Sequence, residues 1–126
     1  MPDKVYRTAI YCRLSREDGD KVESNSIASQ RAICEDYIAR HDDLELVCEP
    51  FVDDGYSGVS FNRPQFKKLE EAIRKGALDC IVVKDLSRFS RNYIDGGRYI
   101  EKIFPQLGIR FIAINDAYDS LTGDPQ

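Results

Sequence analysis

Apolar and polar residues follow two different periods along this chain. Four apolar runs have the length of a β-strand and lie at residues 8–12, 44–52, 80–83 and 110–114. Between these runs, apolar residues recur every three or four positions, which is the spacing of one face of an α-helix. The pattern therefore predicts four strands that alternate with three helices.

The first predicted helix follows a polar loop at residues 16–25. Ser24 or Ser26 can cap its first turn, because a serine hydroxyl accepts a hydrogen bond from an unpaired N–H group at a helix start. The second predicted helix begins at Pro64, since proline is favoured at the first helical position, and it ends at Gly76. The expected buried residues are Ile27, Cys34, Tyr37 and Ile38 in the first helix, and Phe66, Leu69 and Ile73 in the second.

The third predicted helix begins near Asn92 and stops around Gly108. Its apolar residues recur at helical spacing and are expected to face the core: Ile94, Ile100, Ile103 and Phe104. Strands that alternate with helices form β-α-β units, in which the strands are parallel and helices cover both faces. We therefore predict a three-layer α/β fold with a mainly parallel sheet of four to five strands, formed by residues 1–126 as a single domain.

Length and charge narrow the possible functions. A chain of 126 residues fits one domain, and 42% apolar residues can supply its core. No apolar stretch approaches the roughly 20 residues of a membrane span, and the first residues lack the apolar core of a secretion signal, so we expect a cytoplasmic protein. The net charge of −4 argues against a domain that holds DNA mainly by bulk electrostatic attraction.

The four cysteines do not have the spacing of a metal site. None forms a C-x-x-C pair and the chain has one histidine, so no zinc site is predicted. Cys12, Cys34 and Cys80 lie within apolar patterns, and Cys48 lies within the second predicted strand. We expect them to be small core residues in a reducing compartment rather than disulfide partners.

Charged residues gather where three of the predicted strands end. Arg13 and Ser15 follow the first strand, and Arg63 follows the second. Arg88 and Arg91 follow the third, in a segment that also contains Lys84, Asp85 and Ser87, whose roles the sequence leaves open. Since the carboxyl ends of parallel strands meet at one edge of a sheet, where such folds form their ligand sites, we expect these side chains to converge.

Several arginines at one edge suit a phosphate group, because each guanidinium can bind two phosphate oxygens and stays charged at any working pH. Together they could stabilise a pentacovalent phosphorus transition state without a metal. Ser15 offers a hydroxyl nucleophile, which is weak unless its proton is removed or its oxyanion is stabilised. No histidine lies near these loops, so activation would come from the arginines, a carboxylate or a phosphate oxygen.

Each of these residues also has a simpler interpretation. Single arginines in loops are mostly solvated surface groups, and loop serines often serve only in turns. Asp53 and Asp54 could be metal ligands or turn residues, and the composition of the segment favours a turn. The number of arginines expected at one edge is the feature that favours a phosphate site.

Three motifs occur in a fixed order along the chain. The first is Tyr-Cys-Arg-Leu-Ser at residues 11–15, followed by Ser-Ile-Ala-Ser-Gln at 26–30. The second is Asp-Gly-Tyr-Ser-Gly at 54–58, followed by Arg63-Pro64, and the third is Val-Lys-Asp-Leu-Ser-Arg-Phe-Ser-Arg at 83–91. In these motifs nearly the whole chain resembles the N-terminal catalytic domain of the serine recombinases, the resolvase and invertase family. The similarity is greatest to the large serine recombinases and transposases of bacterial mobile elements.

The resemblance implies a role for each matching position. Ser15 would attack a DNA phosphodiester to give a 5′-phosphoserine intermediate and a free 3′-hydroxyl. Gln30 matches a supporting polar position, and Asp79 matches a further position without an assigned role. The phosphate-clamping arginines would be Arg13, Arg63, Arg88 and Arg91. The resemblance further implies no metal or other cofactor, double-stranded DNA as partner, dimers and tetramers of the full-length protein, and a location in the bacterial cytoplasm.

The sequence departs from the small resolvases at several points. Ser87 stands where they usually carry an aspartate, and the loop at 16–25 is longer, so the large subgroup is favoured and the general base stays open. The family's long helix, used for dimer and DNA contacts, is not found before Gln126. We therefore expect a fragment of a longer protein, with weak DNA affinity and no complete recombination of its own.

Two other functions fit an α/β domain of this length. A receiver-type signalling domain would carry an acidic phosphorylation site, but the acidic pair Asp53–Asp54 follows the second strand rather than the first. A non-catalytic module that binds nucleotides or proteins is the other alternative, although no glycine-rich phosphate-binding motif occurs. Since one fold can serve many functions, the geometry of the site must separate these alternatives from DNA strand transfer.

Overall fold

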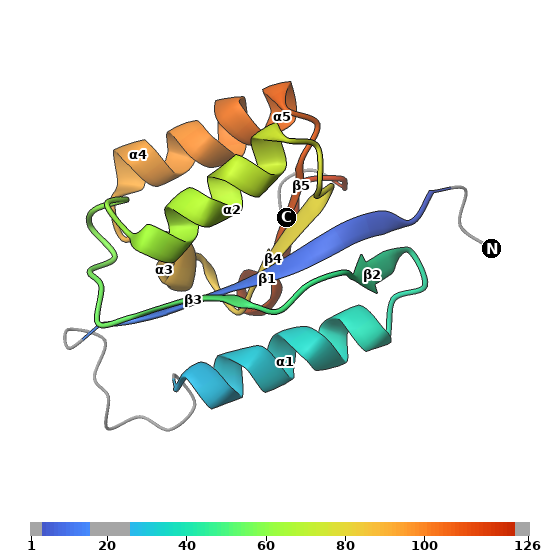
Figure 1. The fold of residues 1–126 in the computed structure, drawn as a ribbon, viewed down its shortest axis with the longest axis horizontal. Coiled ribbons are helices and arrows are strands. Elements are labelled where there is room, and N and C mark those ends of the chain that lie inside the picture. The colour runs from blue at the N-terminus through green and yellow to red at the C-terminus, as the bar shows by residue number, and fades with distance from the viewer. Residues whose placement is uncertain (1–3, 16–25, 123–126) are drawn as a thin grey trace.

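A computed structural model describes residues 4–15 and 26–122 of the chain (Figure 1). In this described part, the sheet has six strands in the order β2-β1-β4-β5-β6, and β3 also pairs with β1. Every pairing is parallel except that of β5 with β6, which is antiparallel. The strands are β1 (Tyr6–Leu14), β2 (Leu44–Leu46), β3 (Phe51–Asp54), β4 (Cys80–Val83), β5 (Arg110–Ala113) and β6 (Tyr118–Asp119).

The second predicted strand, 44–52, is divided in the structure. Tyr6 of β1 pairs with Leu44 of β2, and Tyr11 of β1 pairs with Phe51 of β3. The chain from Leu44 to Phe51 therefore contains more residues than the part of β1 that it faces. Pro50 precedes β3 and has no N–H group to donate to a strand ladder. The predicted strand position of Cys48 is therefore wrong, because this exposed cysteine lies in the interruption.

The first two helices begin where the sequence signals predict, and the second also ends there. Helix α1 (Ile27–Ala39) is capped by Ser26, whose hydroxyl accepts a hydrogen bond from the Ser29 N–H group at 3.1 Å. The alternative cap, Ser24, lies outside the described residues. Helix α2 (Pro64–Arg74) has Pro64 at its first position, and Gly76 follows it with a left-handed φ of 77°.

The third predicted helix is a continuous helical segment with a change of period. It comprises α4 (Tyr93–Arg98), a π-helical turn η3 (Tyr99–Ile103) and α5 (Phe104–Gln106), with Asn92 as its cap. Pro105 gives a reason for the wider turn, because a proline ring collides with the carbonyl four residues earlier in a regular α-helix. The predicted burial of Ile94 is wrong, since this side chain is 81% exposed and Gly96 faces the interior instead.

Three short elements near the carboxyl ends of β4 and β5 are not predicted by the apolar pattern of the sequence. They are helix α3 (Leu86–Phe89), the 3₁₀ turn η4 (Ile114–Asp116) and strand β6. Each has at most four residues, which is too short for a periodic apolar pattern. Strand β5 ends at Ala113, one residue before the predicted end, because Ile114 belongs to η4.

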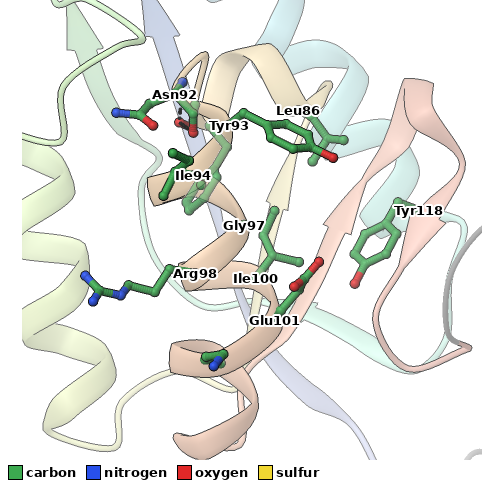
Figure 2. Close-up of a pocket in the computed structure, with 13 residues that line it drawn as sticks. Leu86, Asn92, Tyr93, Ile94, Gly97, Arg98, Ile100, Glu101 and Tyr118 are labelled. Atoms are coloured by element: carbon green, nitrogen blue, oxygen red, sulfur yellow. Dashed lines mark hydrogen bonds between the residues drawn. The ribbon is translucent and has the colours of Figure 1, made fainter.

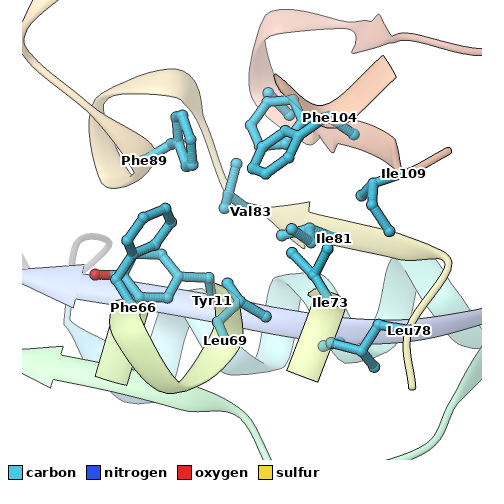
Figure 3. Close-up of a cluster of buried hydrophobic side chains, with 13 residues drawn as sticks. Tyr11, Phe66, Leu69, Ile73, Leu78, Ile81, Val83, Phe89, Phe104 and Ile109 are labelled. Carbon is cyan, nitrogen blue, oxygen red and sulfur yellow. The ribbon is translucent and has the colours of Figure 1, made fainter. Parts of the chain in front are cut away.

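Helices cover both faces of the sheet, as the sequence predicts (Figure 1). Helix α1 lies on one face, where Cys34 and Ile38 pack against strand residues such as Cys12 and Val82. Helix α2 and the α4–α5 segment lie on the other face, over a cluster rich in aromatic rings (Figure 3). That cluster contains Tyr11, Phe66, Leu69, Ile73, Phe89, Phe104 and Phe111. The expected three-layer α/β architecture is thereby confirmed.

The predicted core role of three cysteines is also confirmed. Cys12, Cys34 and Cys80 are completely buried and none forms a disulfide. Burial raises the pKa of the Cys12 and Cys80 thiols to about 12, so both stay protonated near neutral pH. No helix in the described part of the chain is both long and apolar enough to cross a membrane.

Candidate functional site

The carboxyl ends of β1, β3 and β4 meet at one edge of the sheet, as the strand pairings require. Ser15 directly follows β1 and is 6% exposed. Arg13, near the end of the same strand, is completely buried. Its guanidinium donates hydrogen bonds to the backbone carbonyls of Tyr56, Ser87 and Arg88 at 2.5–3.1 Å. Arg13 thus joins β1 to the loops that follow β3 and β4, and the predicted convergence of these three segments is confirmed.

Two further side chains hold the backbone of Arg13. The buried Gln30 of α1 accepts a hydrogen bond from the Arg13 N–H group at 3.1 Å and donates one to the Arg13 carbonyl at 2.9 Å. The Arg88 guanidinium donates to the same carbonyl at 3.1 Å. Gln30 and Arg88 therefore fix the end of β1 two residues before Ser15.

Arg63 occupies the interior between β1 and the helices, and none of its surface is exposed. Its guanidinium donates to the backbone carbonyls of Ser60, Phe89 and Gly58 at 2.8, 2.7 and 3.3 Å. The same group donates to the hydroxyl of Tyr11 at 3.3 Å. Arg63 thus ties the loop after β3 to the end of α3.

The buried Asp53 is linked to Arg63 through the hydroxyl of Tyr11. It accepts hydrogen bonds from the backbone N–H groups of Gln65 and Phe66, both at 2.9 Å, and from the Tyr11 hydroxyl at 2.8 Å. Burial raises the pKa of Tyr11, so its hydroxyl keeps the proton that it donates. Asp53 therefore caps α2 from the neighbouring strand. The predicted turn at Asp53–Asp54 is wrong, because both residues belong to β3 and the chain turns at Gly55, whose φ is 95°.

Gly58 is the point at which three of the arginines meet. Its carbonyl accepts hydrogen bonds from the Arg91 backbone N–H group at 2.7 Å and from Arg63. A Cβ atom at this position would lie 2.7 Å from Nη2 of Arg13 and 2.8 Å from Cγ of Arg91. No other residue type fits there without moving an arginine, which gives the last glycine of the second motif a structural reason.

Arg91 and Asp79 differ from the other predicted site residues. Arg91 contacts the site through its backbone N–H group, which binds the Gly58 carbonyl, and the residue as a whole is exposed. Asp79 lies next to Arg7 at the amino end of the sheet, which is roughly 26 Å along β1 from Ser15. Hydrogen bonds from Arg7 lower the pKa of Asp79 to about 2. The structure therefore does not place Asp79 with the other predicted site residues.

The segment after β4 contains a network that the sequence leaves unassigned. Asp85 caps α3 by accepting a hydrogen bond from the Arg88 N–H group at 3.2 Å. The Ser87 hydroxyl donates to Asp85 at 2.5 Å and accepts from Nε and Nη2 of Arg88 at 3.3 and 3.2 Å. Nζ of the buried Lys84 lies 3.8 Å from Asp85. One carboxylate, Asp85, thus lies close to two cationic side chains, Lys84 and Arg88.

An open groove of about 640 Å³ runs along α4 and η3 (Figure 2). None of the seven predicted site residues lines it. At its rim Tyr93 is 94% exposed and Ile94 is 81% exposed. The groove therefore borders α3 through Leu86 and Phe89 but is not lined by Ser15 or the predicted arginines.

The arginine arrangement has a clear chemical capacity. Backbone carbonyls hold the guanidinium groups of Arg13 and Arg63 in place, so the positive charge is fixed without being cancelled by those contacts. Fixed charge in a poorly solvated site interacts more strongly with an anion than the same charge in water. Such an edge can stabilise a phosphate group that gains negative charge during a reaction at Ser15.

Comparison with known proteins identifies the family of this chain. Residues 8–125 match the family described as "Resolvase, N terminal domain". Over 110 residues the chain is 31% identical to a protein of Bacillus subtilis (strain 168) called "Putative DNA recombinase". That alignment covers 87% of this chain but 21% of the relative, so the chain spans about a fifth of that protein's length.

Solved structures show the same relationship. The N-terminal catalytic domain of TP901-1 integrase superposes with a TM-score of 0.79 at 28% identity, covering 91% of this chain and 82% of that chain. A resolvase family site-specific recombinase from Streptococcus pneumoniae gives a TM-score of 0.67 at 27% identity, over 94% and 77% of the two chains. Because the family match extends over nearly all of the sequence, the chain belongs to the resolvase family of serine recombinases.

Proposed function

We propose that this chain carries the catalytic site of a site-specific DNA recombinase in which Ser15 is the nucleophile. The observation that carries the proposal is that Gln30 and Arg88 both bind the backbone of Arg13, two residues before Ser15, while the Arg13 guanidinium binds the carbonyl of Arg88. A buried serine hydroxyl is weakly nucleophilic alone, and a fixed cationic surrounding is one way to favour its attack on an anionic diester.

The proposed reaction exchanges one phosphate ester for another. Oγ of Ser15 forms a bond to phosphorus while the bond between phosphorus and the 3′-oxygen of the DNA breaks. The serine proton passes to a base, and the departing 3′-oxygen takes up a proton to become a hydroxyl. A 3′-hydroxyl then attacks the 5′-phosphoserine and restores Ser15. No cofactor is needed, because the phosphoserine conserves the bond energy.

The four arginines would contribute in two ways. Arg91, as an exposed residue, would contact a DNA phosphate directly. Arg13, Arg63 and Arg88 are at most 2% exposed, and they would supply fixed positive charge and hold the loops in place. Since all of these effects grow as negative charge builds on the phosphate, they would raise the cleavage rate more than the affinity for DNA.

The alternative of a receiver-type phosphorylation site at Asp53 has little support. Both carboxylate oxygens of Asp53 accept hydrogen bonds from α2, and the residue is 1% exposed. A phosphodonor would have to disrupt the start of α2 to reach it. Recombination of paired sites on double-stranded DNA, with assembly into dimers and tetramers, is proposed for the full-length protein, of which this chain would be a part.

A nicked DNA substrate that cannot religate tests the nucleophile in the full-length protein. Wild type should accumulate a covalent protein–DNA adduct, and Ser15→Ala should abolish it. Ser120→Ala is a matched control, because the Ser120 hydroxyl accepts a hydrogen bond from the Phe111 N–H group, away from this edge, and should leave the adduct unchanged. An adduct that survives in Ser15→Ala would overturn the assignment.

A further inference from the structure

The hydroxyl of Ser87 connects a carboxylate to a buried arginine. A hydroxyl has one hydrogen to donate and two lone pairs with which to accept. The hydrogen of Ser87 is directed to Oδ1 of Asp85, which can only accept when it is a carboxylate. The oxygen therefore faces Arg88 as an acceptor and receives both Nε–H and Nη2–H, at 3.3 and 3.2 Å.

Arg88 also has a carboxylate close by. Its side chain is 2% exposed, and Nε lies 3.7 Å from Oδ1 of Asp85. A charge removed from water to this extent requires a compensating partner and a full set of hydrogen bonds. Asp85 supplies both, directly through its charge and indirectly through Ser87, while Nη1 of Arg88 continues to the carbonyl of Arg13.

We propose that Asp85 and Ser87 act together as positioning residues that orient the Arg88 guanidinium for the cleavage reaction. The proposal rests on the proposed function, because it assumes that Arg88 acts on the phosphate. In this arrangement Asp85 sets the direction of the Ser87 hydroxyl, the hydroxyl sets the plane of the Arg88 fork, and the fork meets the backbone of β1 before Ser15.

The simplest competing explanation is that Asp85 only caps α3. The structure provides a matched control for it, since Asp116 also binds the start of the same helix by accepting a hydrogen bond from the Leu86 N–H group at 2.7 Å. Asp116 binds the helix through Leu86, whereas Asp85 contacts Arg88 twice, at its backbone N–H group and at its guanidinium. A loss that arises from the helix start alone should therefore appear in Asp116→Ala as well.

The substitutions separate charge, hydroxyl and helix capping. Asp85→Asn keeps a side chain that caps helices as well as aspartate does, but it removes the carboxylate. Ser87→Ala removes the hydroxyl and Ser87→Thr retains it. In the double variant Asp85→Asn with Ser87→Asp, a carboxylate is placed directly against the Arg88 guanidinium, where the Ser87 oxygen now lies within 3.3 Å.

The experiment measures single-turnover adduct formation by the full-length protein on the nicked substrate, together with DNA affinity and melting temperature. We expect a loss of about 10- to 100-fold in rate for Asp85→Asn and Ser87→Ala, the size expected when a reacting group is slightly misplaced. DNA affinity should stay near wild type, and rates are compared per folded molecule, because Asp85→Asn removes the charge partner of a buried arginine and should lower the melting temperature. Ser87→Thr and the double variant should recover most of the rate, and Asp116→Ala should change it little.

Several outcomes would overturn the inference. They are wild-type rates in Asp85→Asn and Ser87→Ala, an equal loss in Asp116→Ala, or no recovery in the double variant. If these occur while Ser15→Ala still abolishes the adduct, the positioning role alone fails. If the adduct persists in Ser15→Ala, the proposed function itself fails, so the two failures are distinguishable.

Discussion

The two ends of the parallel sheet bind their arginines with different partners. At the amino end, Arg7 donates to both carboxylate oxygens of Asp79, and Arg110 donates to Asp119 and Asp43. At the carboxyl end, Arg13 donates to three backbone carbonyls, and Arg63 donates to carbonyls and the Tyr11 hydroxyl. The two arginines of the amino end thus bind carboxylates, whereas Arg13 and Arg63 bind several neutral acceptors and Arg88 lies close to both a carbonyl and the Asp85 carboxylate.

Under the proposed function, this difference would separate arginines that serve stability from arginines that serve the reaction. A carboxylate cancels the charge of the arginine it binds, so such a pair serves the fold. A carbonyl fixes the guanidinium without itself cancelling the positive charge. Burying charge in this way is costly, which gives a physical reason why the carbonyl-bound arginines occur where a phosphate is proposed to bind.

The largest expected effect is on catalysis at the carboxyl end. Arg88→Ala should lower the rate of adduct formation by about 100- to 1000-fold, because one preorganised cationic donor is lost from the transition state. DNA affinity, measured by titration, should change little. Arg7→Ala, at the amino end, is the matched arginine control and should retain the wild-type rate. A comparable loss in Arg7→Ala would break the distinction between the two ends.

The next effect is on stability at the amino end. The Arg110 side chain is 6% exposed and forms ion pairs of 2.6 Å with Asp119 and 2.8 Å with Asp43. Arg110→Ala should lower the free energy of unfolding by about 3 kcal/mol, since it leaves two carboxylates without their buried partner. Urea denaturation gives this value. Cleavage per folded molecule should stay normal, and a specific loss of cleavage would contradict the division of roles.

The smallest expected effect is a pH dependence at Asp79. Because the pKa of Asp79 is lowered from 3.8 to about 2 in the fold, its contribution to stability is complete above pH 4. That contribution is lost as the pH falls from about 4 to about 2. Asp79→Asn should melt a few degrees below wild type at pH 7, and the gap should close over this range. A gap that stays constant with pH would exclude the ionised carboxylate as its cause.

Much of the fold could be predicted because its signals are local. Pro64 and Gly76 mark the limits of α2, and the apolar run at 80–83 marks β4, since each requires only neighbouring residues. The division of the segment 44–52 could not be predicted in the same way. It depends on how that segment pairs with β1, and the presence of Pro50 alone does not determine the register.

The site shows the same limit at the level of side chains. The rule that strand ends meet at one edge brought Arg13 and Arg88 together correctly. It could not show that their partners would be carbonyls, because those contacts depend on the backbone path of the loops. Asp53 was assigned to a turn for a similar reason. Its role as a cap depends on the distance between β3 and α2, which no local pattern contains.

The Gly58 carbonyl limits which substitutions the loop after β3 can accept without moving the arginines. Because that carbonyl and the adjacent Cα set the spacing of Arg13, Arg63 and Arg91, the path of the main chain determines the arrangement of the charges. The neighbouring side chains of Tyr56 and Val59 are exposed at 38% and 54%. Substitutions at these two positions would therefore change the exposed surface of the loop after β3 while the charge geometry stays constant, so under the proposed function the preference for a DNA sequence could diverge without loss of the chemistry.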